Sequence, residues 1–124
     1  RCTCTRRAIV HEAVADRFFA AVVRAAKAMQ VGDPRRDPPV FMGPVISTAA
    51  KQAVLDFNRR LAESGAEMLL AATAPEIDGG HYVTPSIARV PRFSAAPASA
   101  GPGFDSGCDE EVFGPLLRVS TVQS

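Results

Sequence analysis

Residues 12–30 carry a stripe of apolar side chains at helical spacing, and this pattern restricts the fold to one in which a long helix packs on a second layer. Its residues recur every three or four positions and would bury one face of a helix. The stripe consists of Val14, Phe18, Ala21, Val22, Ala25 and Met29. Gly32 follows as a stop signal, because glycine readily adopts the conformation that ends a helix. We therefore predict a long amphipathic helix that needs a second layer to cover its apolar face.

A second helix is predicted between Ser47 and Gly65. The Ser47 hydroxyl can accept a hydrogen bond from an unpaired amide of the first turn, and Gly65 marks the end. The apolar face of this helix consists of Ala50, Val54, Phe57 and Leu61. The intervening residues 32–43 are rich in proline and charge, so we expect a loop there.

Four short apolar segments are predicted to be strands. They cover residues 7–10, 67–72, 82–90 and 116–122. Pro85 lies inside the third segment and indicates a bend or an edge, because proline has no amide hydrogen to donate. Helices that are separated from strands by short loops indicate the α/β class, with helices packed on a mostly parallel sheet.

The whole chain, residues 1–124, is predicted to be part of one domain. It starts at Arg1 rather than at a methionine and stops at Ser124 within a strand pattern, so we expect a longer parent protein. Residues 91–107 are dominated by serine, alanine, proline and glycine. Such a stretch buries little apolar surface, and we predict a flexible surface loop there.

Composition narrows the range of partners and compartments. Hydrophobic residues make up 47% and charged residues 22%, as in ordinary globular domains, and the net charge is +1. This charge gives no reason to expect nucleic acid, and no apolar stretch is long enough to cross a membrane. The three cysteines are too few and too unevenly numbered for a disulfide framework, which favours a reducing compartment, the cytoplasm by default.

Cys2 is the residue best suited to act as a nucleophile. A thiolate is a strong nucleophile, and neighbouring cations such as Arg1, Arg6 and Arg7 favour the thiolate form. The alternative is a small buried thiol, which is the commoner role of a free cysteine. Cys4 is expected to be structural.

A zinc site is a second alternative for these side chains. The available ligands would be Cys2, Cys4, His11, His81 and Cys108. No second closely spaced pair completes a zinc signature, so we predict no metal site and regard Cys108 as a bystander.

The acidic segment from Asp109 to Pro115 is the second candidate. By composition it is a solvated acidic loop that leads into a strand. A carboxylate there could instead accept hydrogen bonds from ribose hydroxyls, as acidic residues do in dinucleotide sites. The aromatic ring of Phe113 could pack against a flat ring.

Four segments, taken together and in order, resemble the aldehyde dehydrogenase family. They are Arg1-Cys2-Thr3-Cys4-Thr5-Arg6-Arg7, Met42-Gly43-Pro44-Val45-Ile46-Ser47, Tyr82-Val83-Thr84-Pro85-Ser86-Ile87 and Glu110-Glu111-Val112-Phe113-Gly114-Pro115. The continuation Thr3-Cys4-Thr5-Arg6-Arg7 and the ending Phe113-Gly114-Pro115-Leu116-Leu117-Arg118-Val119 resemble most the branch that oxidises succinylated glutamate semialdehyde. The stretch 91–107 is longer than that branch usually has.

This resemblance implies a mechanism and a set of partners. Cys2 would attack a small-molecule aldehyde and carry a thioester, Glu111 would bind the ribose of NAD (or NADP), and Phe113 would contact its nicotinamide side. The parent would be a homo-oligomer. No residue of this chain corresponds to the family's general-base glutamate or its oxyanion asparagine, so the chain by itself is expected to have no turnover.

Overall fold

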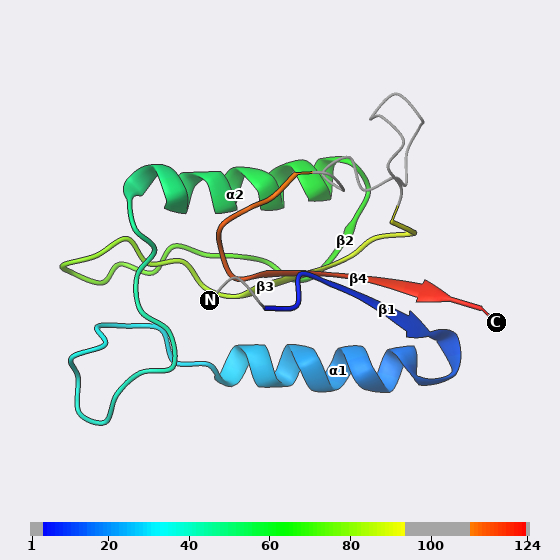
Figure 1. Ribbon diagram of the computed structural model, residues 1–124, viewed down its shortest axis with the longest axis horizontal. Helices are drawn as coiled ribbons and strands as arrows, with labels where there is room; N and C mark the ends of the chain where they lie inside the picture. The colour runs from blue at the N-terminus through cyan, green and yellow to red at the C-terminus, as the bar shows by residue number, and fades with distance from the viewer. Residues whose placement is uncertain (1–3, 94–109, 124) are drawn as a thin grey trace.

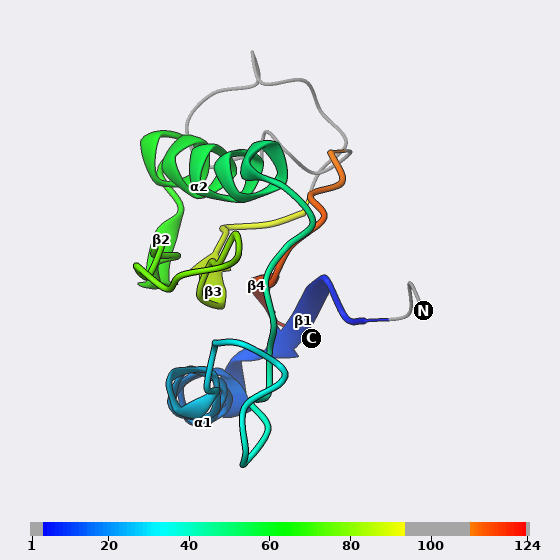
Figure 2. The ribbon, with the colours of Figure 1, turned by 90° about the vertical axis from the view of Figure 1, so that its left-hand side faces the viewer.

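The computed structural model describes residues 4–93 and 110–123, which form a four-stranded sheet between two helices. In chain order the elements are β1 (Arg7–His11), α1 (Glu12–Ala28), α2 (Thr48–Glu63), β2 (Glu67–Leu70), β3 (Ser86–Arg89) and β4 (Leu116–Val122). α1 and α2 cover opposite faces of the sheet, as two views at right angles show (Figures 1 and 2). The α/β architecture predicted from the sequence is therefore confirmed.

The sheet is mostly parallel, with the strand order β1-β4-β3-β2. β4 pairs in parallel with both β1 and β3, and only β2 is antiparallel to its neighbour β3. The first and last strands of the chain thus lie side by side, with Arg7 opposite Arg118 and His11 opposite Val122. This pairing brings the segments that precede β1 and β4, which come from the two ends of the sequence, to the same side of the sheet, where both strands begin.

α2 begins and ends as predicted. The Ser47 hydroxyl accepts a hydrogen bond from the Ala50 amide at 3.1 Å, and Gly65 has a positive φ of 92°. Glycine adopts this left-handed conformation without the strain that a side chain would add. Val54, Phe57 and Leu61 are fully buried and pack α2 on the sheet.

α1 presents a different face to the sheet from the one that the apolar stripe predicts. Its buried residues are Ala15, Phe19 and Ala26, whereas Val14 is 42% and Phe18 38% exposed. Of the predicted stripe, Val22 does pack against this core, but most of the buried positions lie one residue later, so the buried face is rotated around the helix axis toward Ala15, Phe19 and Ala26. The cause is the link to β1: His11 is both the last strand residue and the N-cap, its Nδ1 accepting from the Ala13 amide at 3.2 Å. With no residues between strand and helix, β1 sets the rotation of α1.

The predicted strand over residues 82–90 is too long. Tyr82 and Val83 are buried but unpaired with the sheet, and β3 begins only at Ser86, whose amide donates to the Pro115 carbonyl at 2.8 Å. Pro85 cannot donate to such a ladder, which explains where the strand starts. The strand predicted over residues 67–72 ends at Leu70. From residue 94 on, the predicted loop lies outside the described residues.

Within the described residues, no helix is both long and apolar enough to span a membrane.

Candidate functional site

The cysteine segment and the acidic loop meet at the amino ends of two neighbouring strands. Cys4, Thr5 and Arg6 lead into β1, and residues 110–115 lead into β4. Because β1 and β4 are parallel neighbours, the segments that precede them emerge at the same edge of the sheet. The Arg118 amide donates to the Arg6 carbonyl at 3.0 Å and extends the pairing to this edge. Cys2 and Cys108 lie outside the described residues.

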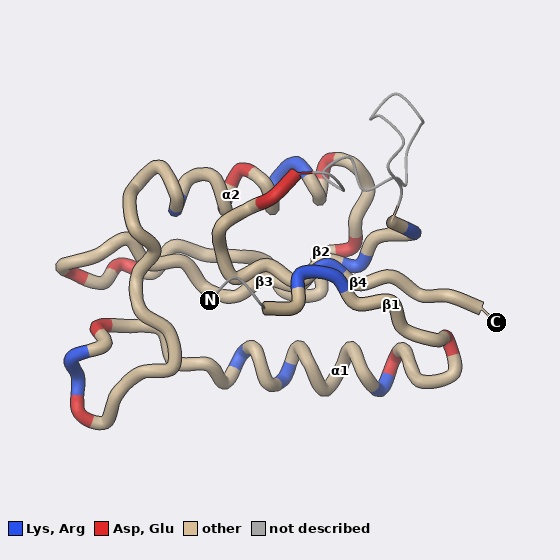
Figure 3. The backbone as a smooth tube through the Cα atoms, viewed as in Figure 1, with Lys and Arg blue, Asp and Glu red and all other residues tan. Residues whose placement is uncertain are grey.

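Arg6 joins the two segments through its side chain. Its Nη2 forms an ion pair with Glu111 Oε1 at 2.9 Å, and its Nη1 donates to the Val112 carbonyl at 3.1 Å. The guanidinium carbon also lies 5.4 Å from the centre of the Phe113 ring, within the range of a cation–π contact. Figure 3 shows the basic segment at the start of β1 and the acidic segment that precedes β4. The two predicted cofactor ligands, Glu111 and Phe113, are therefore held by one guanidinium.

Both predicted cofactor ligands are accessible. The Glu111 side chain is 60% exposed and Phe113 is 66% exposed. An exposed aromatic ring beside a carboxylate offers a flat apolar surface and a hydrogen-bond acceptor to the same ligand.

A cavity of about 330 Å³ opens beside the cysteine segment. Cys4, Thr5 and Arg6 form one wall, and residues of α1, β3 and β4 form the others. The Ser86 hydroxyl, on a residue that lines this cavity, is buried and has no hydrogen-bond partner within the part of the chain described. The cavity lies at the amino ends of β3 and β4, because it is lined by their first residues and by Pro85 and Pro115.

The acidic loop is also attached to α2. Both carboxylate oxygens of Glu110 accept hydrogen bonds from Arg60, which donates through Nη1 at 2.9 Å and through Nη2. Gly114 packs so closely on Val54 that a Cβ atom at this position would overlap the Val54 side chain. Arg60 and Gly114 thus fix the loop from the α2 side, while Arg6 fixes it from the β1 side.

The hydrogen bonds from Arg60 lower the pKa of the Glu110 carboxyl below its ordinary value of 4.5. A carboxyl with a lowered pKa in the folded state adds stability above its unfolded pKa, and this stability is lost as the pH falls. We expect Arg60→Gln to lower the free energy of unfolding by about 0.5–1 kcal/mol at pH 7, as for other partly exposed ion pairs. The difference from the wild type should shrink as the pH falls below about 4.5.

Urea unfolding of the wild type and of Arg60→Gln, at pH 7 and at successively lower pH, measures this effect. Arg59→Gln is the matched control, because Arg59 pairs on the outer face of the same helix with Asp56 and Glu63 and does not contact the loop. A difference for Arg60→Gln that stays constant across this pH range would contradict the assignment to Glu110.

Asn58 and His81 have polar partners within the fold. Asn58, the sole asparagine of the sequence, donates from its amide to the Val54 carbonyl at 2.9 Å and accepts from the Ala72 amide at 3.3 Å. His81 lies 3.2 Å from the Thr48 hydroxyl through Nδ1. Among the residues that the structure describes, no three His, Cys, Asp or Glu side chains are grouped so that they could hold a metal ion.

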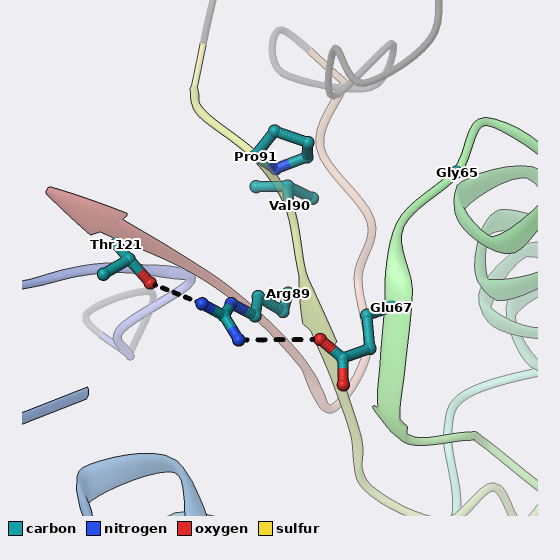
Figure 4. A pocket seen from close by; sticks show the side chains of 6 residues that line it. All are labelled: Gly65, Glu67, Arg89, Val90, Pro91 and Thr121. Atoms are coloured by element: carbon teal, nitrogen blue, oxygen red, sulfur yellow. Dashed lines mark hydrogen bonds and ion pairs between the residues drawn. The ribbon is translucent and has the colours of Figure 1, made fainter. Parts of the chain in front are cut away.

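A second pocket, of about 250 Å³, lies at the opposite ends of β3 and β4 (Figure 4). The guanidinium of Arg89 crosses it, donates to the Thr121 hydroxyl at 3.3 Å and lies 3.7 Å from Glu67. The same guanidinium lies 5.4 Å from the centre of the Phe19 ring. Arg89 of β3 thus connects β2, β4 and α1. These contacts indicate that the pocket has a structural role.

Comparison with known proteins identifies the family of this chain. The sequence model of the aldehyde dehydrogenase family matches residues 1–124. The chain belongs to the aldehyde dehydrogenase family. Members of this family are oxidoreductases.

One aldehyde dehydrogenase relative is the N-succinylglutamate 5-semialdehyde dehydrogenase of Pseudomonas fluorescens. It is 38% identical over 120 residues, which are 96% of this chain and 22% of that enzyme. The chain thus spans about a fifth of the length of the curated relatives it matches.

Solved aldehyde dehydrogenase structures share the fold. Lactaldehyde dehydrogenase from Escherichia coli superposes with a TM-score of 0.79 at 29% identity, over 100% of this chain and 24% of that one. The protein PnpE, solved in complex with nicotinamide adenine dinucleotide, superposes with a TM-score of 0.78 at 33% identity, again over 100% and 24%.

Sequence reasoning did not identify Arg6 and Arg60 as residues that hold the site. From the sequence, Arg6 is a cation near Cys2 and a member of the segment that resembles the family, with no contact assigned to it. The available signal is charge pairing: Arg6 and Arg7 precede one strand, and Glu110 and Glu111 precede another. Complementary charges before two strands favour contact only if those strands are parallel neighbours, and this pairing was not visible in the sequence.

Proposed function

We propose that residues 1–124 form part of the catalytic domain of an NAD-dependent aldehyde dehydrogenase, with Cys2 as its nucleophile and 91–107 as a surface loop. The observation that carries the proposal is the contact of Arg6, four residues after Cys2, with Glu111, Val112 and Phe113. It ties the cysteine segment to the two residues that the family resemblance assigns to the cofactor. Family membership and the exposure of Glu111 and Phe113 support the same proposal.

In the proposed reaction, the Cys2 thiolate attacks the carbonyl carbon of the aldehyde. The new C–S bond leaves a negative charge on the carbonyl oxygen, and the backbone amide of Cys2 would donate to this oxyanion. The aldehyde carbon loses a hydride, which gives a thioester on Cys2. Water then attacks the thioester, breaks the C–S bond and releases the acid with the free thiol.

NAD, when bound, supplies the acceptor for that hydride. The described residues fit it: the Glu111 carboxylate pairs with Arg6 through Oε1 and its side chain is 60% exposed, so it can accept a hydrogen bond from a ribose hydroxyl. The Phe113 ring is exposed beside it and offers a flat surface to the nicotinamide side. NADP remains the alternative cofactor within the same proposal.

Two groups that the reaction needs must come from outside this chain. The family's oxyanion asparagine has no counterpart here, because both ends of the Asn58 amide are engaged within the fold. No glutamate of the chain corresponds to the general base that activates the water. The proposed catalytic unit is therefore the longer parent protein, which we propose to be a cytoplasmic homo-oligomer.

As substrate we propose N-succinyl-L-glutamate 5-semialdehyde, oxidised to N-succinyl-L-glutamate in arginine breakdown. The relative from Pseudomonas fluorescens with this activity in its name supports the choice. The substrate carries carboxylates, which arginine binds well through its paired donors. Arg1, next to the nucleophile, is the proposed contact, and Arg1→Gln should raise the KM for this aldehyde but not for a neutral one.

The test compares the protein expressed from its complete natural reading frame with the 124-residue chain. We expect the complete protein to reduce NAD with the succinylated aldehyde, at a kcat/KM at least about tenfold above that for lactaldehyde, because one good charged contact has about this effect on binding. The chain alone should show no turnover. The measurement is NADH absorbance with each aldehyde.

Each outcome distinguishes a different reading. A preference for lactaldehyde would indicate an aldehyde dehydrogenase that acts on another substrate. No turnover by the complete protein with any aldehyde would favour a non-catalytic domain. Turnover by the 124-residue chain alone would contradict the requirement for outside groups.

A further inference from the structure

The side chain of Arg6 contacts three consecutive residues of the acidic loop. It pairs with the Glu111 carboxylate, donates to the Val112 carbonyl and lies over the face of the Phe113 ring. A guanidinium is a planar, rigid group with several donors, so these contacts fix positions relative to one another. The Glu111 carboxylate and the Phe113 ring thus both contact the guanidinium that is hydrogen-bonded to the Val112 carbonyl between them.

The backbone of Arg6 is held in place by hydrogen bonding to the sheet. Its carbonyl accepts from the Arg118 amide at 3.0 Å, and the next residue, Arg7, is in register with Arg118 in the β1–β4 ladder. The Arg6 side chain is only 29% exposed, whereas that of Glu111 is 60% exposed. The guanidinium is therefore a well-anchored partner for a carboxylate that is otherwise open to solvent.

Two arginines bind the acidic loop, and each pairs with a different one of the adjacent residues Glu110 and Glu111. Arg60 engages both oxygens of Glu110 and connects the loop to α2. Arg6 engages Oε1 of Glu111, whose side chain remains 60% exposed. Both oxygens of Glu110 are thus hydrogen-bonded to its arginine, whereas the exposed carboxylate of Glu111 can accept a further hydrogen bond from a ligand.

We propose that Arg6 is a positioning residue for the cofactor: it holds Glu111 by one oxygen, leaves the other oxygen for a ribose hydroxyl and fixes the Phe113 ring beside it. This inference rests on the proposed function, because it needs a cofactor at Glu111. It adds a direct link between the segment that carries the nucleophile and the loop that holds the cofactor. A residue that only stabilised the fold would not affect the cofactor selectively.

The experiment uses the complete protein with NAD, the succinylated aldehyde and the variants Arg6→Gln, Arg6→Lys, Glu111→Gln and Arg6→Gln/Glu111→Gln. We expect Arg6→Gln to raise the KM for NAD, and the Kd for NAD measured by calorimetry, about tenfold, with kcat within about threefold of the wild type. Arg6→Lys keeps the charge but loses the fork of donors, so its effect should be intermediate. The double variant should bind NAD no more weakly than Glu111→Gln alone, since the two residues act as a unit.

Arg35→Gln is the matched control, because Arg35 forms an ion pair with Asp33 in an exposed loop and should leave the KM unchanged. Additive effects of Arg6 and Glu111, or an unchanged KM and Kd in Arg6→Gln with wild-type turnover intact, would overturn this inference alone. If Arg6→Gln fails to fold, Arg6→Lys decides by the same criterion. A wild-type protein with neither turnover nor NAD binding would overturn the proposed function and this inference with it.

Discussion

Cys2→Ser should abolish NAD-dependent oxidation of the aldehyde by the complete protein, with kcat reduced by roughly 10³-fold or more. The serine hydroxyl keeps nearly the same shape but has a far higher pKa than a thiol, so almost no anion is present at neutral pH. Without the anion, neither the C–S bond nor the thioester can form. NADH absorbance measures turnover, and calorimetry with NAD shows whether the cofactor still binds.

Cys108→Ser is the matched control for this result, since it makes the same atomic change at a cysteine that the family resemblance does not assign to the site. We expect its kcat within about twofold of the wild type, as for most substitutions away from a reacting group. Alkylation by iodoacetamide gives a second readout: Cys2 should react fastest, and the aldehyde should protect it. Full turnover by Cys2→Ser, or equal slow alkylation of all three cysteines, would contradict its role as nucleophile.

The fold was largely predictable because its signals are local. The hydroxyl of Ser47 and the left-handed conformation of Gly65 fix the ends of α2 through contacts within a few residues. The strand pattern over residues 116–122 matches β4 in full. The face of α1 was not predictable, because two adjacent apolar stripes are present and only the tertiary link through His11 selects between them.

The site was predictable only in its parts. The residues Glu111 and Phe113 came from a resemblance of motifs, and the structure brings them together with Arg6. Arg6 and Val112 are 106 positions apart, so no local pattern connects them. Their contact depends on the placement of β4 between β1 and β3, a property of the whole sheet. The role of Cys2 stays a prediction, since it lies outside the described residues.

Phe19→Ala should lower the free energy of unfolding by about 3–5 kcal/mol, as other large-to-small changes at buried phenylalanines do. Phe19 is 5% exposed, packs with Ala15 and Ile87 in the core between α1 and the sheet, and has the guanidinium of Arg89 over its ring. Alanine would leave a cavity in this core and remove the ring from the cation. A loss of this size is a large fraction of the 5–15 kcal/mol that stabilises a typical domain.

Phe18→Ala is a matched control one position away, because it removes the same side chain from the face that the sequence stripe predicts to be buried. Phe18 is 38% exposed and touches Phe19 edge-on at a ring distance of 6.0 Å. A partly exposed ring leaves a smaller cavity, so the expected loss is about 1 kcal/mol. Urea unfolding followed by circular dichroism gives both values. Equal losses, or a larger loss for Phe18→Ala, would show that α1 turns the stripe of Val14 and Phe18 inward, and the rotation that β1 imposes on α1 would be wrong.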